Sequence, residues 1–79
     1  MRLELYGVLT EVAGQTRLEL EKPAEGTVAA ALEAAATACP ELADHLPRVA
    51  VAVGDALVPP DAPVEEDSVL VLLPPVSGG

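Results

Sequence analysis

The side chains that could do chemistry in this chain of 79 residues are few: one histidine, His45, and one cysteine, Cys39. His45 stands between Asp44 and Leu46. Because a catalytic triad or a metal site needs partners from elsewhere in the fold, we interpret it as a lone surface histidine. Cys39 closes an apolar stripe at a helix C-terminus, where the helix dipole disfavours a thiolate. A buried, unreactive cysteine is therefore favoured over a nucleophile.

The remaining candidates for chemistry are carboxylates, and their pattern points to no bound group. The run Glu65-Glu66-Asp67 lacks the spacing and the glycine of an EF-hand loop, so we interpret it as a solvated turn. The chain contains neither a Walker-type loop nor a G-x-G-x-x-G loop. We therefore expect no metal site, and no cofactor bound by the chain itself.

Composition excludes several classes of partner. The chain has 13 acidic and 4 basic residues, which gives a net charge of -9, and Tyr6 is its only aromatic residue. Such a charge repels phosphate backbones, and base-stacking platforms are missing, so a nucleic-acid partner is excluded. The sequence shows no signal peptide and no apolar run of ~18 residues, so a soluble, cytoplasmic protein without a membrane partner is expected. The length predicts one domain spanning residues 1–79.

The hydrophobic pattern predicts an α+β fold. Apolar residues at helical spacing predict one main helix over residues 28–39, with Thr27 as its N-cap and Pro40 as its end. Residues 10–13 are expected to form a loop or a single helical turn, and the loop 41–46 a short turn of helix. Strands are predicted where residues alternate with a period of two or are continuously apolar: 2–8, 16–21, 48–53, 56–58 and 69–73. The first two strands should form an N-terminal hairpin.

The last predicted strand is apolar on both of its faces. Val69, Val71 and Leu73 point to one side, and Leu70 and Leu72 point to the other. One helix covers only one face of a sheet, so the other face should expose Leu and Val side chains close to the C-terminus, which is typical of a protein-protein contact. The alternative is that the loop 59–68 folds over that second face.

The last residues of the sequence form the most distinctive motif. Pro74-Pro75 should stiffen the exit from the last strand, and residues 76–79 should form a mobile arm reaching on the order of 13 Å beyond it. Glycine has no Cβ, so the pair Gly78-Gly79 could enter a channel too narrow for any other residue. A terminal carboxylate delivered in this way is a substrate for another enzyme's active site. The alternative is a frayed end with no role.

The ending Leu-Leu-Pro-Pro-Val-Ser-Gly-Gly resembles that of the molybdopterin synthase small-subunit family, ubiquitin-like sulfur carriers of the MoaD/ThiS superfamily. Residues 5–14, Thr27-Val28, 49–53 and 66–69 resemble the family's opening strand, helix start, third strand and acidic turn. The resemblance implies a ubiquitin-like β-grasp: a mixed sheet of four or five strands with one main helix on one face. It also implies that residues 74–79 form a flexible tail.

The resemblance further implies a cycle in which partners perform the chemistry. An ATP-dependent activating enzyme adenylylates the carboxylate of Gly79, and a persulfide sulfur donor then replaces AMP to leave a thiocarboxylate. The tail enters the large subunit of molybdopterin synthase, a heterotetramer, and donates its sulfur to the pterin precursor. ATP is used by the activating enzyme, and the chain itself is a non-catalytic cosubstrate subunit with Gly79 as the carrier residue.

The resemblance also carries over a set of partner-binding residues. They lie in the first strand, after the third strand, at the end of the last strand and in the tail: Tyr6, Leu57, Leu73, Pro75, Val76, Ser77 and Gly78. The chain departs from the family pattern at Thr10, where the family often has arginine, and at Leu72 and Leu73, where it has aromatic residues.

Three other functions remain open at this point. A similar carrier can serve thiamine synthesis, tRNA thiolation or cysteine synthesis. A ubiquitin-like protein modifier would instead join its terminus to lysines of target proteins through isopeptide bonds. In a plain interaction module, the tail would be inert.

Overall fold

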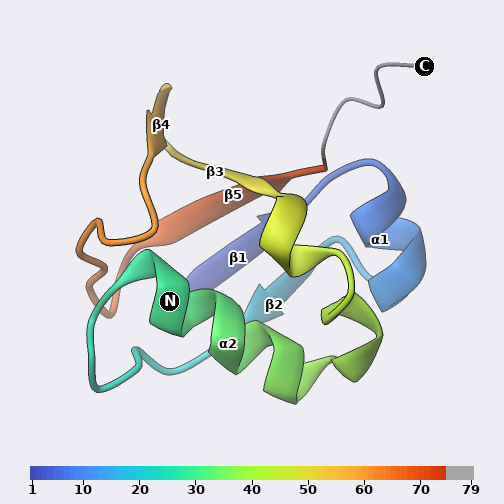
Figure 1. The fold of residues 1–79 in the computed structure, drawn as a ribbon, viewed down its shortest axis with the longest axis horizontal. Helices are drawn as coiled ribbons and strands as arrows, with labels where there is room; N and C mark the ends of the chain where they lie inside the picture. The colour runs from blue at the N-terminus through green and yellow to red at the C-terminus, as the bar shows by residue number, and fades with distance from the viewer. Residues whose placement is uncertain (75–79) are drawn as a thin grey trace.

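The computed structural model describes residues 1–74 and contains one mixed sheet of five strands in the order β2-β1-β5-β3-β4 (Figure 1). The strands are β1 (Arg2–Leu5), β2 (Arg17–Glu19), β3 (Ala50–Val53), β4 (Ala56–Val58) and β5 (Val69–Leu73). The helices are α1 (Val8–Ala13) and α2 (Val28–Ala38), and the 3-10 turns are η1 (Pro40–Leu42) and η2 (Leu46–Arg48). The α+β class expected from the sequence is confirmed. Within residues 1–74, no helix has the length and apolar character that crossing a membrane requires.

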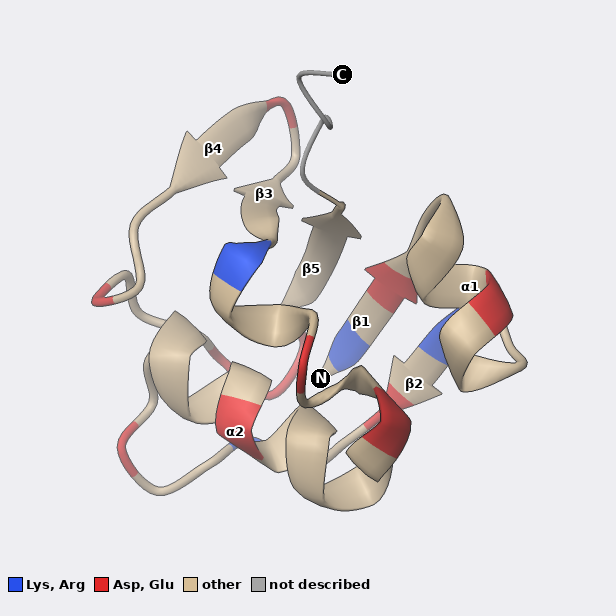
Figure 2. Ribbon diagram, turned by 45° about the vertical axis from the view of Figure 1, so that its right-hand side comes forward, with Lys and Arg blue, Asp and Glu red and all other residues tan. Residues whose placement is uncertain are grey.

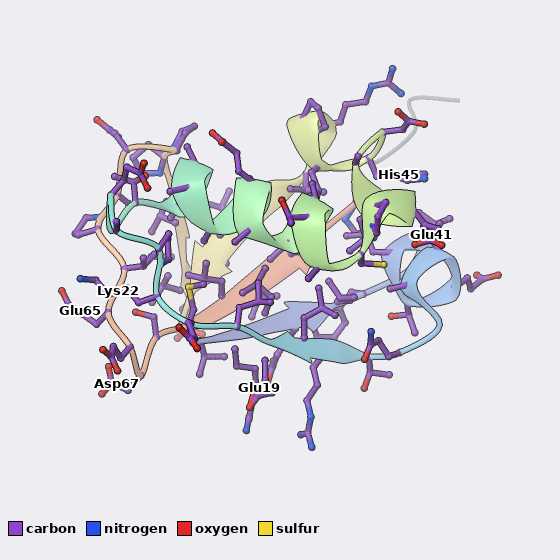
Figure 3. The ribbon with its side chains drawn as sticks, turned by 90° about the horizontal axis from the view of Figure 1, so that it is seen from below. Glu19, Lys22, Glu41, His45, Glu65 and Asp67 are labelled. Carbon is purple, nitrogen blue, oxygen red and sulfur yellow. The ribbon has the colours of Figure 1, made fainter. Side chains whose placement is uncertain are left out.

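The centre of the sheet is the parallel pair β1 and β5, in which Leu3 lies opposite Leu70 and Leu5 opposite Leu72. These four leucines are almost completely buried, and they face α2, which lies across this side of the sheet (Figure 3). The other side carries no helix in the described part of the chain. The alternating pattern of β1 therefore has the physical cause expected of a sheet covered on one face.

Helix α2 begins and ends where its sequence predicts. The Thr27 hydroxyl accepts a hydrogen bond from the backbone N–H of Ala30 at 3.2 Å, which satisfies one of the unpaired donors of the first turn. Ala31 and Ala35 lie one turn apart and are fully buried against the sheet. Pro40 follows the last turn and starts η1 instead of extending the helix.

The first predicted strand is wrong over its last three residues. β1 ends at Leu5, Gly7 has φ 59° and ψ −137°, and the chain then forms α1, a helix longer than the single turn that was expected. Leu9, inside α1, is fully buried, so the helix packs this side chain into the core. The left-handed Gly14 closes α1, with its N–H donating to the Thr10 carbonyl at 2.9 Å.

Two other strands are shorter than predicted. β2 covers Arg17–Glu19 instead of 16–21, although Met1 and Leu20 still exchange backbone hydrogen bonds of 2.9 Å beyond its end. β3 begins at Ala50 because the preceding residues form the 3-10 turn η2. Leu46, in that turn, is buried. Burial of this leucine thus favours a turn over an earlier start of the strand.

The loop 59–68 packs against the start of α2 and does not cover the open face of the sheet. The backbone N–H groups of Val28 and Ala29 donate to the carbonyls of Ala62 and Pro60 at 2.9 and 2.8 Å. Val64 is 1% exposed and belongs to the main core. The alternative in which this loop shields the second face is therefore wrong, and the expected exposure of that face is confirmed.

Candidate functional site: the outer sheet face and the base of the tail

We call the side of the sheet turned away from α2 the outer face, and it divides into two halves. The register of the strands places apolar side chains on the half formed by β5, β3 and β4: Val69, Val71, Leu73, Ala52 and Leu57. It places charged side chains on the half formed by β1 and β2: Arg2, Glu4, Arg17 and Glu19. Glu19 accordingly points away from α2 in Figure 3.

The apolar half is continuous across three strands. Ala52 lies opposite Val71 on one side and opposite Leu57 on the other, so the three side chains form one row. Leu57 is 69% exposed and Val69 is 39% exposed, while Val71 and Leu73 are half-buried. Ala52 itself is 8% exposed, so the accessible surface comes from the larger side chains on either side of it. Exposed aliphatic side chains gathered on one face of a small domain are typical of a protein-binding surface.

The charged half contains one ion pair, which joins β1 and β2. Arg2 Nε donates to Glu19 Oε2 at 3.2 Å, and both side chains remain substantially exposed. Figure 2 shows the basic segments of β1 and β2 next to acidic ones, whereas β5 carries no charged residue. The outer face therefore presents an apolar surface bordered on one side by paired charges.

The two strands that form the base of the tail end side by side. Leu5 lies opposite Leu72 in the parallel pair, so the next residues, Tyr6 and Leu73, continue at the same end of the sheet. There the turn at Gly7 meets Pro74, the last described residue: a Cβ on Gly7 would lie 2.9 Å from Pro74 Cγ. Figure 1 shows the end of β5 reaching the loop between β1 and α1.

Three residues with predicted partner-binding roles lie on this surface. Tyr6 is 49% exposed and follows Leu5, whose register partner Leu72 precedes Leu73, so the fold places Tyr6 and Leu73 at the same end of the sheet. Leu57 lies on the same face but at the far edge, on β4, two strands away from β5. The other predicted site residues lie outside the described part of the chain: Pro75, Val76, Ser77, Gly78 and Gly79.

Sequence reasoning missed an apolar hollow of about 520 Å³ on the opposite side of the sheet, between α2, η2, β3 and β4. It is lined in part by Ala29 and Ala36 of α2, whose short side chains leave the space between helix and strands unfilled. Leu57 borders it as well as the outer face. The alanine richness of α2 is the sequence signal for such a space, because short side chains leave volume between packed elements.

The side chains first considered for chemistry lie apart from this surface. Cys39 is 8% exposed, which agrees with the expected burial, and its Sγ lies 3.5 Å from Glu41 Oε1. His45 is half-buried and not on the open surface that was expected, because it is part of the turn that leads into the buried Leu46. Within residues 1–74, no cluster of three or more His, Cys, Asp or Glu side chains is placed to hold a metal ion.

A mixed five-stranded sheet with one main helix on one face defines the ubiquitin-like β-grasp fold. A model of the ThiS family matches residues 3–79, and the chain belongs to this family. The resemblance to the MoaD/ThiS superfamily drawn from the sequence is thereby confirmed.

Solved structures give the same fold. SAMP1 from Haloferax volcanii is 28% identical, with a TM-score of 0.82 over 99% of this chain and 97% of that chain. A structure of small archaeal modifier protein 1 from H. volcanii is 24% identical, with a TM-score of 0.83 over 95% of each chain, and this likeness concerns the fold alone. None of the curated proteins compared with the chain matches it.

Proposed function

We propose that this chain is the sulfur-carrying small subunit of a molybdopterin synthase. One observation carries the proposal: the apolar half of the outer face ends at Leu73 and Pro74, directly before the sequence Pro-Val-Ser-Gly-Gly. A partner that binds this face also receives the chain end. Membership of the ThiS family supports sulfur transfer as the chemistry of that end.

The reacting group is the carboxylate of Gly79, which must first acquire a leaving group. A carboxylate oxygen attacks the α-phosphorus of ATP on the activating enzyme, releases pyrophosphate and forms an acyl adenylate. The terminal sulfur of a persulfide then attacks the acyl carbon and expels AMP. Cleavage of the sulfur-sulfur bond by a thiol reductant leaves the thiocarboxylate. The large subunit holds the pterin precursor, and the chain contributes the nucleophilic sulfur.

The outer face supplies recognition in this proposal, and the tail supplies reactivity. Tyr6 and Leu73 lie at the base of the tail, so a partner held there keeps Gly79 within a few residues of its binding surface. Such tethering replaces a bimolecular encounter by an effectively intramolecular one. The activating enzyme and the large subunit use the same face in turn, so each is expected to compete with the other for the chain.

The decisive experiment is intact-mass analysis after incubation with an activating enzyme, ATP and a persulfide donor. We expect a product in which one oxygen of the chain has been replaced by sulfur, and we expect removal of Gly79 to abolish it. A Glu66→Gln variant, altered at the opposite end of β5, is the matched control and should react like the original chain. Supply of the large subunit and pterin precursor should then yield molybdopterin. A thiocarboxylate that forms but gives no molybdopterin would assign the carrier to another sulfur pathway.

The similarity to SAMP1 and small archaeal modifier protein 1 favours a second candidate, a protein modifier. Here the ε-amine of a target lysine attacks the activated carbonyl of Gly79, AMP leaves, and an isopeptide bond forms. Lys22 is the only lysine of this chain, so conjugates between copies through a lysine can form only there. The last basic residue of the chain is Arg48, so trypsin leaves residues 49–79 attached to a modified lysine. Mass spectrometry of such branched peptides tests this candidate, and Lys22→Arg separates self-conjugation from conjugation to other proteins.

A further inference from the structure

We propose that Gly7 is a positioning residue for the tail: it lets the Pro74 ring pack against the β1–α1 turn and thereby sets the direction in which residues 75–79 leave the domain. This inference rests on the proposed function, because it concerns the delivery of the carboxylate of Gly79. It extends that function by assigning a role to a residue outside the tail and outside the apolar half of the outer face.

The contact is unusually close. A Cβ added to Gly7 would lie 2.9 Å from Pro74 Cγ and 3.7 Å from Pro74 Cδ, and real Cβ atoms do not approach a neighbouring carbon to 2.9 Å. The other glycines of the described chain differ. A Cβ on Gly14 or Gly54 would meet nothing within 4 Å. One on Gly26 would meet the flexible side chain of Lys22 at 3.4 Å and the Val64 carbonyl oxygen at 3.9 Å, which is ordinary van der Waals contact. Among these glycines, only Gly7 has its missing side chain replaced by a neighbouring ring, that of Pro74, which directly follows β5.

The turn that carries Gly7 is fixed by three hydrogen bonds. Thr10 Oγ1 donates to the Leu5 carbonyl at 2.9 Å, and the N–H of Thr10 donates to the Gly7 carbonyl at 3.1 Å. The N–H of Leu9 donates to the Tyr6 carbonyl at 3.2 Å, and the Leu9 side chain is fully buried. Because these hydrogen bonds hold the turn on both sides of Gly7, the turn cannot move away to relieve a clash between an added methyl group and Pro74.

Pro74 has equally little freedom on its own side. Leu73 is paired with Ala50 in the sheet, and a residue before proline is restricted to extended conformations. The Pro74 ring fixes its own φ, and Pro75 restricts Pro74 in the same way. The way left to relieve a clash with Gly7 is to turn the chain at Pro74. Such a turn changes the direction of the backbone at the last described residue, from which the sequence continues to Gly79.

Misplacement of a reacting group by about 1 Å can reduce a rate on the order of 10²-fold. The expected effect of a side chain at Gly7 is therefore on the reaction of the tail and not on the binding of the outer face. Gly7 also has a positive φ, which any side chain strains. Gly14 provides a control for a side chain at positive φ without a clash, since it has φ 73° and open space around it. Its ψ of 17° is left-handed helical, so a side chain there is less strained than at Gly7, whose ψ is −137°.

The test compares Gly7→Ala, Gly14→Ala, Pro74→Ala and the double variant Gly7→Ala/Pro74→Ala. Adenylylation by the activating enzyme is followed as kcat and KM, and thermal unfolding is followed in parallel. We expect Gly7→Ala to lower kcat at least tenfold with KM changed less than threefold. Gly14→Ala should lose less thermal stability than Gly7→Ala and keep kcat within twofold of the original chain, and the double variant separates the Pro74 clash from backbone strain at Gly7. Removal of the ring in the double variant should restore most of the lost rate.

Equal kcat for Gly7→Ala and Gly14→Ala, or a double variant no faster than Gly7→Ala, would overturn the positioning role. Nuclear magnetic resonance separates this failure from failure of the proposed function. If the original chain is not adenylylated at all, the proposed function fails, but the contact can still be tested. The backbone amide chemical shifts of residues 76–79 should change in Gly7→Ala and stay unchanged in Gly14→Ala. If they are unchanged in both variants, the contact between Gly7 and Pro74 does not influence the tail.

Discussion

The two faces of β5 carry the same kinds of side chain, but one face is buried in the core and the other is partly exposed. Leu70 and Leu72 are fully buried under α2, whereas Val69, Val71 and Leu73 face away from the helix and keep part of their surface exposed. The register alone makes this division, because neighbouring residues of a strand point to opposite faces. One run of aliphatic residues therefore contributes to stability on the inner side and is available for binding on the outer side.

This division means that stability and partner binding can be altered separately along one strand. Burial of a leucine contributes about 1.5–3 kcal/mol to folding, and a chain of this size has few such side chains to lose. A half-buried residue at the end of the strand contributes less to folding and more to a complex that completes its burial. A substitution on the inner face should thus lower stability and leave partner affinity unchanged, and one at the adjacent outer position should do the reverse.

The largest effect is expected at Leu72, on the inner face. Leu72→Ala should lower the free energy of unfolding by about 2–5 kcal/mol, because it removes packing atoms and leaves a cavity between the sheet and α2. Urea unfolding followed by far-ultraviolet circular dichroism measures this loss. The molecules that stay folded should bind the partner with an affinity unchanged within about twofold. If the free energy of unfolding falls by less than about 1 kcal/mol, the inner face does not dominate stability.

Leu73→Asp should give the opposite pattern. A carboxylate in the apolar half of the outer face must be desolvated when a partner covers it, so the Kd for the large subunit should rise at least about tenfold, or about 1.4 kcal/mol. The free energy of unfolding should change by less than about 1 kcal/mol, since water can still reach the side chain at position 73 in the free chain. Titration calorimetry measures the affinity, and Arg17→Ser, on the exposed charged half, is the control.

An unchanged Kd for Leu73→Asp would remove Leu73 from the interface and weaken the division between the faces of β5. An equal loss for Arg17→Ser would show that the whole outer face, and not its apolar half, contacts the partner. Both outcomes leave the fold assignment untouched, because neither residue belongs to the buried core.

Much of this arrangement could be predicted from periodicity. The double apolar character of residues 69–73, set against a single long helix, correctly predicted an exposed sheet face. The stripe from Val28 to Cys39, bounded by Thr27 and Pro40, correctly placed α2. These predictions succeeded because each depends on one element and on what covers it.

The predictions that failed depend on contacts between distant segments. Alternation through Val8 suggested a longer first strand, but the buried Leu9 and the turn at Gly7 favour a helix. The contact of Gly7 with Pro74 joins the two ends of the sequence, so no local pattern reveals it. The hollow beside α2 arises in the same way, from short side chains that meet only once the strands and helix have packed.

The smallest predicted effect concerns the ion pair of Arg2 and Glu19, on the charged half of the outer face. Its Nε–Oε2 distance is 3.2 Å, but the side chains are 40% and 64% exposed, so water screens the attraction. A double-mutant cycle with Arg2→Gln and Glu19→Gln should give a coupling free energy of about 0.2–1 kcal/mol. At 1 M salt the screening length falls to about 3 Å, and the coupling should nearly vanish. A coupling above about 2 kcal/mol that persists in salt would mean that this half is structurally as important as the buried side of β5. The outer face would then no longer be separable from stability, and Arg17→Ser would lose its value as a neutral control.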